Sequence, residues 1–272
     1  MQPQSINYLG PKTEVVLGDL TLTAVAGMSV WSSREPTADT CEIVLPDLPG
    51  DLAAQVEKDA PLVVRHGYKG YDMETIFTGT VVDVLPKKRL TVFGADAMRL
   101  LFETKLTITF QDETPTSIIR KMVGDLGIDV SQVTEIEDAL DRLPLYRNTV
   151  WQAVKMINDR MVRQGSPQAG LPHDFFVDET GAFRWEPRDL EQEPSFEFVY
   201  GKNILDCDLK VSGTSTLLTV GMPVRHSTVV SVTDRLGETA NFYVMAARHF
   251  LAPKGGSRTF LKMERVVSGA EP

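Results

Sequence analysis

Apolar and polar residues alternate in short runs through the first third of the chain. The segments EVVLGDLTLTAV, TCEIVL and TIFTGTVVDVL repeat with period two, which is typical of half-buried β-strands. Turn signals at Gly18-Asp19 and Pro86-Lys87-Lys88 separate such strands, and Gly79 within a strand predicts a bulge or a bend. Asp51–Lys58 is expected to form one or two helical turns. Five or six strands in about 95 residues favour a small antiparallel barrel or sandwich.

The pattern changes between Lys105 and Trp185, where helical spacing appears. After a strand at Lys105–Phe110, Thr114 is the expected N-cap of a helix and Pro115 its first residue, a position where the missing N–H costs nothing. Its apolar face and its end are formed by Ile118, Ile119, Met122, Leu126 and Gly127. The preceding segment Ala95–Phe102 fits either a short helix or a strand.

A second helix is predicted with Asn148 or Thr149 as its N-cap, and Thr149 and Gln152 have the spacing of a capping box. Its apolar stripe is Val150, Val154, Ile157 and Met161, and Gly165 is its expected end. The acidic stretch Val130–Leu143 predicts a loop with a weak helical turn. Asp174–Val177 and Ala182–Glu186 are expected to pair as a hairpin in which Gly181 adopts positive φ.

From Ser195 the chain again contains only strand candidates separated by glycines, which indicates a second antiparallel barrel of about 70 residues. The predicted fold class is therefore α+β, mainly β, with two small antiparallel β-barrel domains separated by an α/β insert. The domain boundaries are expected at 1–102, 103–194 and 195–272. No clear internal sequence repeat relates the two β halves.

Composition narrows the classes of function. The formal net charge of the 272 residues is −9, which argues against a surface that grips nucleic-acid phosphates but suits a protein past which DNA slides. No apolar run reaches about 18 residues, so no membrane-spanning helix is expected. The N-terminus lacks the pattern of a secretory signal, which favours folding in a cytoplasm.

Cysteine and histidine spacing gives no sign of a metal site. Cys41 and Cys207 lie far apart in strand-like segments and are expected to be buried thiols rather than a disulfide or a catalytic thiol. His66, His226 and His249 each follow an arginine at the end of a strand-like run, and the favoured interpretation is surface or strand-end histidines. His173 next to Asp174 is a weaker candidate for half of a catalytic or metal pair.

Carboxylates and tryptophans give further candidates with a less specific pattern. Asp206 and Asp208 share a strand face and can bind a metal or act in acid–base chemistry, although an exposed strand face is favoured. The acidic run Glu135, Glu137, Asp138 and Asp141 is expected to be a solvated face rather than a calcium site. Trp31, Trp151 and Trp185 are expected in three separate patches rather than as a sugar platform. No nucleophile elbow, HExxH, P-loop or GxGxxG is present. No catalytic, cofactor-binding or metal residue, no cofactor and no enzymatic activity are therefore predicted.

The order of these segments resembles the baseplate hub proteins of tailed bacteriophages over roughly residues 15–265. The segments that carry the resemblance are IFTGTVVDV, KRLTVFGADAMRLL, TPTSIIRKMVGDLGI, RNTVWQAVKMINDRMVRQG and FFVDETGAFRW, followed by a β-rich end. The family includes late-control and tail-spike-associated hubs, and type VI secretion spike proteins have a similar hub part.

The resemblance implies a virion structural protein with two similar barrels in each subunit. Three subunits then form a homotrimeric ring of pseudo-six-fold symmetry that joins the tail tube to the central spike and lets DNA pass without specific binding. Expected partners are the tail tube protein, the spike protein and other baseplate proteins, with assembly in the host cytoplasm. The ring requires sheet edges that neighbours cover, for which Val229 and Phe242 are candidates.

Two alternatives remain open at this stage. One is a tail-associated cell-wall hydrolase that uses Asp206, Asp208 or His173, and the other is a receptor-binding or sugar-binding tail-tip protein that uses the tryptophans. The hub interpretation expects each β half to be a folded sheet of its own. Dissimilar halves, or halves fused into one continuous sheet, would overturn it.

Overall fold

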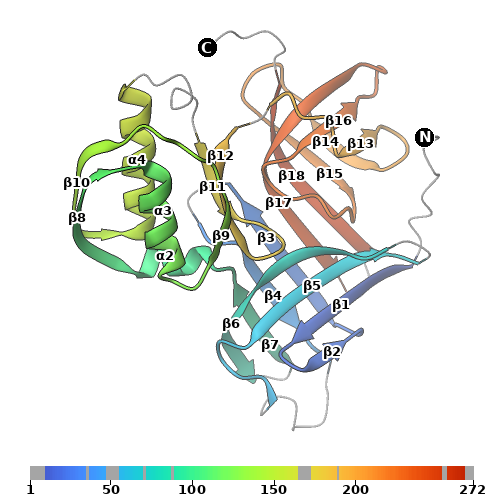
Figure 1. Ribbon diagram of the computed structural model, residues 1–272. Coiled ribbons are helices and arrows are strands. Elements are labelled where there is room, and N and C mark those ends of the chain that lie inside the picture. Colours follow the sequence, from blue (N-terminus) through green and yellow to red (C-terminus); the bar gives the residue numbers. More distant parts are fainter. Residues whose placement is uncertain are drawn as a thin grey trace. The chain divides into compact units, whose positions relative to one another are not determined.

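The computed structural model describes residues 10–34, 37–46, 55–69, 72–86, 89–164, 173–188, 190–252 and 256–266 (Figure 1). The chain divides into two compact units, the first formed by Met1–Ala95 with Leu190–Pro272 and the second by Asp96–Asp189. Strands make up 56% and helices 14% of the residues, so the predicted α+β, mainly β class is confirmed.

The first half of unit 1 is a curled antiparallel sheet with the strand order β3-β4-β7-β6-β5-β1-β2. One face is buried because apolar residues alternate along the strands, and this face forms the first core with Val15, Val30, Ile43, Leu62, Phe77 and Val92. The strands are β1 (Pro11–Leu17), β2 (Leu20–Leu22), β3 (Gly27–Ser33), β4 (Thr40–Val44), β5 (Pro61–Tyr68), β6 (Glu74–Pro86) and β7 (Leu90–Ala95).

The second half of unit 1 is a second curled sheet, in which the order is β14-β15-β18-β17-β16-β13. All its neighbours are antiparallel except β13 and β16, which are parallel. Its separate core contains Phe198, Leu217, Val230, Val244, Leu261 and Met263. The strands are β13 (Phe196–Val199), β14 (Ile204–Asp208), β15 (Thr214–Val220), β16 (Val229–Thr233), β17 (Thr239–Ala252) and β18 (Gly256–Arg265).

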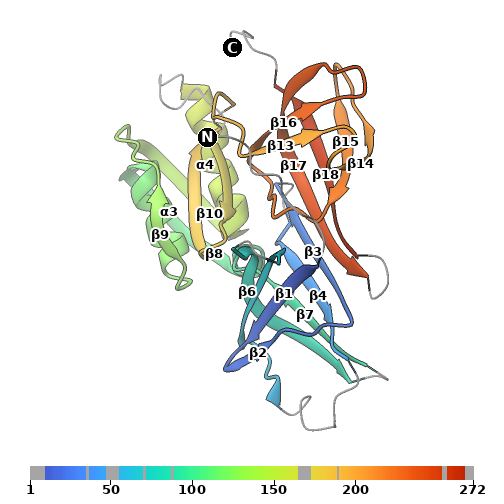
Figure 2. The same cartoon turned by 90° about the vertical axis from the view of Figure 1, so that its right-hand side faces the viewer.

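The two halves have the same strand order once the short strand β2 is left out. In each half the six strands, counted along the chain, lie in the spatial order second, third, sixth, fifth, fourth and first. The fifth strand is the long one in both, and its pairing with the sixth is shifted by a bulge, at Val81–Asp83 in β6 and at Val244–Ala246 in β17. The halves differ in that β1 is antiparallel to its neighbour β5 whereas β13 is parallel to β16. Two curled sheets are visible in Figure 2.

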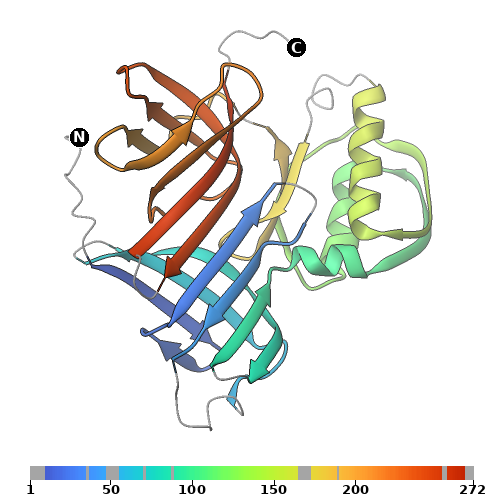
Figure 3. The ribbon, with the colours of Figure 1, turned by 180° about the vertical axis from the view of Figure 1, so that it is seen from behind.

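The two halves are also hydrogen-bonded to each other, so the expectation of two independent sheets is wrong. β17 is 14 residues long, and β16 covers only its first part, Thr239–Tyr243. Along the same edge its second part pairs antiparallel with β3, from Ala246 opposite Ser33 to Leu251 opposite Met28 (Figure 3). One sheet of 13 strands therefore runs through both halves, although each half has a separate hydrophobic core.

Unit 2 contains three helices, a two-stranded sheet and a three-stranded sheet in its described residues. β8 and β10 are antiparallel, and β11, β12 and β9 form the other sheet in that order. The elements are α2 (Met98–Glu103), β8 (Lys105–Glu113), α3 (Pro115–Gly124), β9 (Asp129–Val133), β10 (Leu140–Thr149), α4 (Val150–Gln164), β11 (His173–Val177) and β12 (Ala182–Pro187).

The predicted helix starts in unit 2 are confirmed. The Thr114 side chain accepts a hydrogen bond from the Ser117 N–H, and Pro115 is the first residue of α3. Thr149 and Gln152 form both bonds of the capping box, at 3.2 Å from the Gln152 N–H to Thr149 Oγ1 and at 2.8 Å from the Thr149 N–H to Gln152 Oε1. The hairpin of β11 and β12 turns at Gly181 with φ +88°.

Three sequence expectations need correction or fall outside the described residues. Val130–Leu143 is not a loop with a helical turn, because β9 and β10 occupy much of it and β10 pairs with β8 along its length. Gly79 is not the bulge; a Cβ there would lie 2.3 Å from the carbonyl oxygen of Ala95, so glycine permits a close backbone approach. The expected features at residues 51–54, 87–88 and 165 lie outside the described residues.

Candidate functional site

The seam is the contact between the two halves of unit 1. It comprises β3, β17, the segments next to them, and the ends of β5 and β18, and many polar side chains are hydrogen-bonded across it. Beyond the β3–β17 ladder, the Arg34 N–H donates to the Met245 carbonyl at 2.9 Å and Arg248 Nε donates to Ser29 Oγ at 3.1 Å. These contacts join residues about 200 positions apart in the sequence. The seam therefore fixes the second half against the first.

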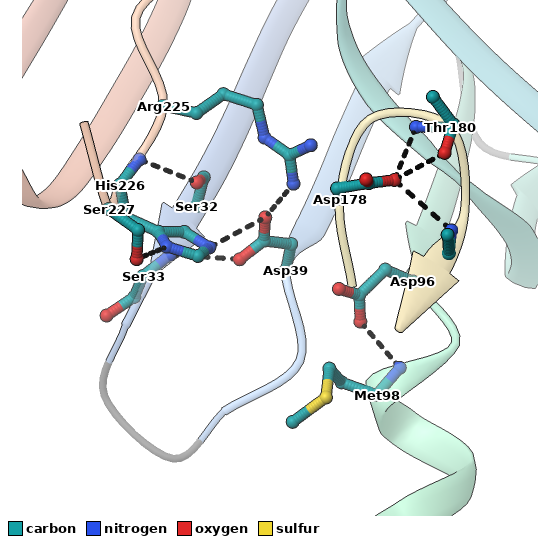
Figure 4. A network of polar contacts seen from close by, with 11 residues as sticks. Ser32, Ser33, Asp39, Asp96, Met98, Asp178, Thr180, Arg225, His226 and Ser227 are labelled. Atoms are coloured by element: carbon teal, nitrogen blue, oxygen red, sulfur yellow. Dashed lines mark hydrogen bonds and ion pairs between the residues drawn. The ribbon is translucent and has the colours of Figure 1, made fainter. Parts of the chain in front are cut away.

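Asp39 is the centre of one seam cluster (Figure 4). Its carboxylate accepts a hydrogen bond from the Ser33 N–H at 2.9 Å and is ion-paired with Arg225 Nη2, also at 2.9 Å. His226 Nε2 lies 3.8 Å from the same carboxylate. Only 4% of the Asp39 side chain and 11% of the Arg225 side chain are exposed, so this pair is largely shielded from water.

A second cluster connects β5 of the first half with β18 of the second. His66 Nε2 is 2.8 Å from Ser257 Oγ, and His66 Nδ1 is 3.2 Å from Thr13 Oγ1. Nearby, His249 Nδ1 lies 3.0 Å from Thr259 Oγ1. A Cβ at Gly221 would lie 2.0 Å from Ser257 Oγ, so only glycine fits beside this cluster.

The histidines of the seam are neutral at neutral pH. Burial lowers the pKa of His66 to about 4, that of His226 to about 4 and that of His249 to about 3. For His226 the Asp39 carboxylate opposes this effect, whereas Arg225 adds to it. Of the expected surface or strand-end histidines, none lies at the surface: His66, His226 and His249 are buried in unit 1, and His173 is buried in unit 2.

The seam has the character of a structural joint rather than of a reaction centre. A general acid or base must reach a substrate proton and have a pKa near the working pH. These histidines are enclosed and their pKa values lie well below neutrality. Among the residues that the structure describes, no group of three or more His, Cys, Asp or Glu side chains could hold a metal ion.

The hydrolase candidates do not form one cluster. Asp206 and Asp208 are exposed on β14 of unit 1, as expected for a solvated strand face. His173 and Asp174 belong to unit 2, where His173 stacks on Trp185 at 4.5 Å between ring centroids and Asp174 is ion-paired with Arg188 at 3.3 Å. The acidic side chains of Glu135, Glu137, Asp138 and Asp141 are all exposed.

Asp178 is a structural carboxylate at the β11–β12 turn of unit 2 (Figure 4). It accepts hydrogen bonds from Thr180 N–H and Oγ1, from the Ala182 N–H and from Arg184 Nε. Burial acts to raise the pKa of Asp178, but the bonds from Thr180, Arg184 and Ala182 outweigh it and lower the pKa. Sequence reasoning predicted the turn here but missed the role of Asp178, although an Asp that starts an Asp-Glu-Thr-Gly stretch is a turn signal.

The tryptophan and cysteine candidates have structural surroundings. Trp185 is fully buried, and Trp151 stacks on Phe102 at 5.5 Å within unit 2. Trp31 lies in unit 1, in the seam strand β3. Cys41 is a free, buried thiol whose pKa is raised by burial, and Cys207 is free and partly buried. The separate positions of the three tryptophans do not favour a sugar platform, and the two free thiols do not favour a disulfide.

The two residues expected to contact neighbouring copies at the sheet edges, Val229 and Phe242, are not exposed. Val229 and Phe242 are buried in unit 1, because β16 and β17 pack on the second core. The exposed large apolar side chains of the described part of the chain are Ile108, Tyr146, Val162, Leu190, Tyr200, Leu205, Val211 and Leu236. Leu205 in β14 and Val211 in the turn after it were not singled out by sequence reasoning.

Solved structures of phage tail proteins share this fold. The 43 kDa tail protein of prophage MuSo2 from Shewanella oneidensis matches with a TM-score of 0.73 at 13% identity, over 94% of this chain and 97% of that chain. A tail protein from Neisseria meningitidis MC58 matches with a TM-score of 0.72 at 16% identity, again over 94% of this chain and 97% of that chain. The resemblance to tail proteins is thereby confirmed for the fold.

A secretion-system protein has the same fold. The Escherichia coli c3393 protein, described as a type VI secretion component similar to the T4 bacteriophage tail proteins gp27 and gp5, matches with a TM-score of 0.69 at 10% identity, over 95% of this chain and 79% of that chain. No established protein-family profile and no curated protein sequence matches this chain. In the described residues, no helix has the length and apolar character needed to span a membrane.

Proposed function

We propose that this protein is a structural baseplate hub of a phage tail, which forms a homotrimeric ring of pseudo-six-fold symmetry between the tail tube and the central spike. The observation that carries the proposal is the duplicated strand order of unit 1, bulge included. A chain with two equivalent half-sheets can present six equivalent units from three copies. The fold shared with phage tail proteins supports the same role.

The continuous 13-stranded sheet changes which part of the chain is the repeated unit of the proposed ring. Two small β-barrel domains in each subunit were expected, and a fusion of the halves into one continuous sheet was the outcome that would overturn this expectation. The β3–β17 pairing is such a fusion, so the hub is proposed here in a different form. The repeated unit is instead a half-sheet with its own core, and β3–β17 is the contact between one repeat and the next. A ring then continues the same kind of strand contact from copy to copy, whereas the polar contacts of the seam belong to the joint within each chain.

A role without catalysis follows from the surroundings of the candidate residues. The enclosed histidines of the seam and the ion-paired Asp174 stabilise structure, and the tail and spike proteins of the same fold are structural components. We therefore assign neither a hydrolase nor a sugar-binding function.

DNA passage through the ring and the identity of the partners are parts of the same proposal. The partners would be the tail tube protein, the spike protein and other baseplate proteins, in a virion assembled in the host cytoplasm. The net charge of −9 favours weak contact with DNA. The exposed face of the joined sheet carries both signs, because Glu42, Glu264, Arg248 and Arg258 are all exposed, so it is not a uniformly acidic wall.

Electron microscopy of the purified protein tests the proposal. Class averages should contain rings with three-fold symmetry and six similar lobes around a central opening. Addition of the cognate tail tube protein should place a six-fold tube on one side of the ring. Monomers or open chains of subunits at every concentration, with no ring on addition of the tube protein, would contradict the proposal.

A further inference from the structure

Side chains of the chain itself occupy main-chain groups at the outer edges of β9 and β13. In both strands these groups are N–H and C=O groups that a further strand would use for pairing. The contacts are those of the Ser131 N–H with Asp129 and of the Val133 carbonyl with Arg120 in β9, and those of the Val199 N–H and the Glu197 carbonyl with Asn203 in β13. A further strand would have to displace these side chains before it could pair there.

The two-stranded sheet of unit 2, β8 with β10, has one edge that is occupied in the same way (Figure 1). On β10, Pro144 has no N–H, and the Tyr146 N–H donates to Asn148 Oδ1 at 2.8 Å. The Arg142 carbonyl accepts a hydrogen bond from the Arg160 side chain of α4. The outer edge of β10 therefore offers few groups to a further strand.

The opposite edge of this sheet, on β8, is open. Pro144 cannot donate, so Pro144 and Thr109 opposite it form a non-hydrogen-bonded pair, and the register places Thr107 and Gln111 in the same kind of pair. The N–H and C=O groups of Thr107, Thr109 and Gln111 therefore point away from β10. Within the described part of the chain, no hydrogen bond involves these outward groups. Three successive outward positions of β8 are thus free to pair.

We propose that the outer edge of β8, at Thr107–Gln111, binds an extended segment of another tail protein, which adds antiparallel to the β8–β10 sheet as a third strand. The inference rests on the proposed hub for the kind of partner, whereas the site rests on the open edge itself. Main-chain hydrogen bonds at the three outward positions supply affinity in such a contact, and side chains at alternate positions supply specificity. The added strand also removes an edge that is otherwise available to wrong partners.

The side chains of β8 indicate which segment fits. Ile108 lies on the same face of the sheet as Phe110, which is buried and has Lys121 Nζ of α3 5.6 Å from its ring centroid. Ile108 is nevertheless 37% exposed. Thr107 and Thr109 lie on the opposite face and are exposed. A strand with apolar residues at alternate positions would cover Ile108 and place its polar residues beside the threonines.

The two ends of this edge carry opposite charges. Lys105 at the start of β8 and Asp112 near its end are both exposed. Asp112 also leaves the extended conformation, with φ +52°, so pairing is expected to end at Gln111. An antiparallel partner fits best with a basic residue near its start and an acidic residue at its end, because opposite charges on neighbouring strands attract.

A second copy of the chain is a poorer source of this strand. The outer edges of its β9, β10 and β13 are occupied by the same side-chain contacts. The contacts between copies in the proposed ring belong to the half-sheets of unit 1, so they leave β8 without a neighbour. Two β8 edges can pair with each other about Thr109, but this contact is isologous, so it joins two copies and builds no ring of three. The partner is therefore a different protein.

A synthetic peptide tests the edge in the full chain. The peptide KKTVTVTVE places valines on the face of Ile108, its central threonine opposite Thr109 and matching charges at both ends. Fluorescence anisotropy of the labelled peptide should give a dissociation constant below about 100 µM. N-methylation of the central threonine removes an N–H that faces β8 and should weaken binding at least about tenfold. N-methylation of the valine after it changes an N–H that faces away and should have little effect.

Two substitutions at Thr109 provide the matched pair on the protein side. Thr109→Pro removes the outward N–H without loss of an internal hydrogen bond, as Pro144 shows for β10, and should weaken peptide binding at least about tenfold. Thr109→Val keeps the N–H and a β-branched side chain, so binding should stay within about twofold of the parent protein. If Thr109→Pro does not fold, the two N-methylated peptides still decide the question.

Three results would overturn the inference: equal binding of the two N-methylated peptides, equal binding by the two variants, or no binding at about 1 mM peptide. A dimer of the chain that Thr109→Pro dissociates would overturn it as well, because a second copy would then occupy the edge. The solution mass separates this inference from the proposed hub. A trimer that does not bind the peptide keeps the ring but not the β8 site, and a monomer that binds it keeps the site but not the ring.

Discussion

Arg225 Nη2 lies 2.9 Å from Asp39 Oδ2 across the seam, so the second β half is ion-paired with a loop of the first. Removal of one partner leaves a shielded charge without its counterion, which typically costs about 3–5 kcal/mol. Asp39→Asn is expected to lower the free energy of unfolding by roughly that amount in urea denaturation. The pair Arg65–Glu14 provides the control, because its side chains are 47% and 20% exposed, and Glu14→Gln should cost less than about 1 kcal/mol. Similar losses in both variants would show that the seam pair is no more important than a surface pair.

Stability is expected to fall in mildly acidic solution. The folded-state pKa values of His66, His226 and His249 lie below their ordinary value, so between pH 6.5 and about 4 the unfolded chain binds more protons than the folded one. The stabilisation by each neutral histidine is fully present above pH 6.5 and is lost as the pH falls toward 4, on the order of 1–2 kcal/mol each by pH 5.

Urea denaturation at pH 8, 6.5 and 5 measures this loss. His226→Asn should reduce the slope between pH 6.5 and pH 5, because it removes one of the three groups. Asp178, whose pKa is lowered, adds a loss only as the pH falls below the ordinary range of a carboxyl group. A stability that stays constant from pH 8 to pH 5 would contradict the burial of neutral histidines in the seam.

Gly79 and Gly124 should respond to alanine in opposite ways. A Cβ at Gly79 would lie 2.3 Å from the backbone oxygen of Ala95, whereas a Cβ at Gly124 in α3 meets nothing within 4 Å. Gly79→Ala is therefore expected to destabilise by about 1–3 kcal/mol. Gly124→Ala should stabilise by about 0.5–1 kcal/mol, because alanine has the higher helix propensity. Thermal unfolding of the two variants measures the difference, and a neutral Gly79→Ala would mean that β6 and β7 are less closely apposed.

The capping box of α4 gives a local test in unit 2. Thr149→Ala removes the acceptor of the Gln152 N–H and should cost about 1 kcal/mol. Thr149→Ser keeps the hydroxyl and should cost much less. Urea denaturation of the two variants and the parent protein measures the difference. Equal losses for alanine and serine would assign the effect to the methyl group rather than to the cap.

Helices and strands that depend on local sequence signals were predicted correctly, whereas those that depend on pairing with distant strands were not. The caps at Thr114 and Thr149 and the period-two strands depend on neighbours in the sequence, and these elements form as expected. Val130–Leu143 was misjudged because β10 is stabilised by β8, about 35 residues earlier in the chain.

The polar contacts of the seam could not be predicted from the sequence for the same reason. Asp39 and Arg225 are 186 positions apart and neither belongs to a motif, so no sequence pattern brings them together. The histidines were misplaced for the same reason, because the sheets that enclose them meet only in the fold. The duplicated strand order was also invisible, since it is conserved in topology and not in sequence.

The mass of the protein in solution tests the central claim most directly. Light scattering from about 1 µM to about 100 µM should give, at the upper end, three times the chain mass of 30.1 kDa, with the trimer dissociating on dilution as mass action requires. A mass of one chain over the whole range, or a stable dimer, would contradict a ring built from three copies of a duplicated sheet.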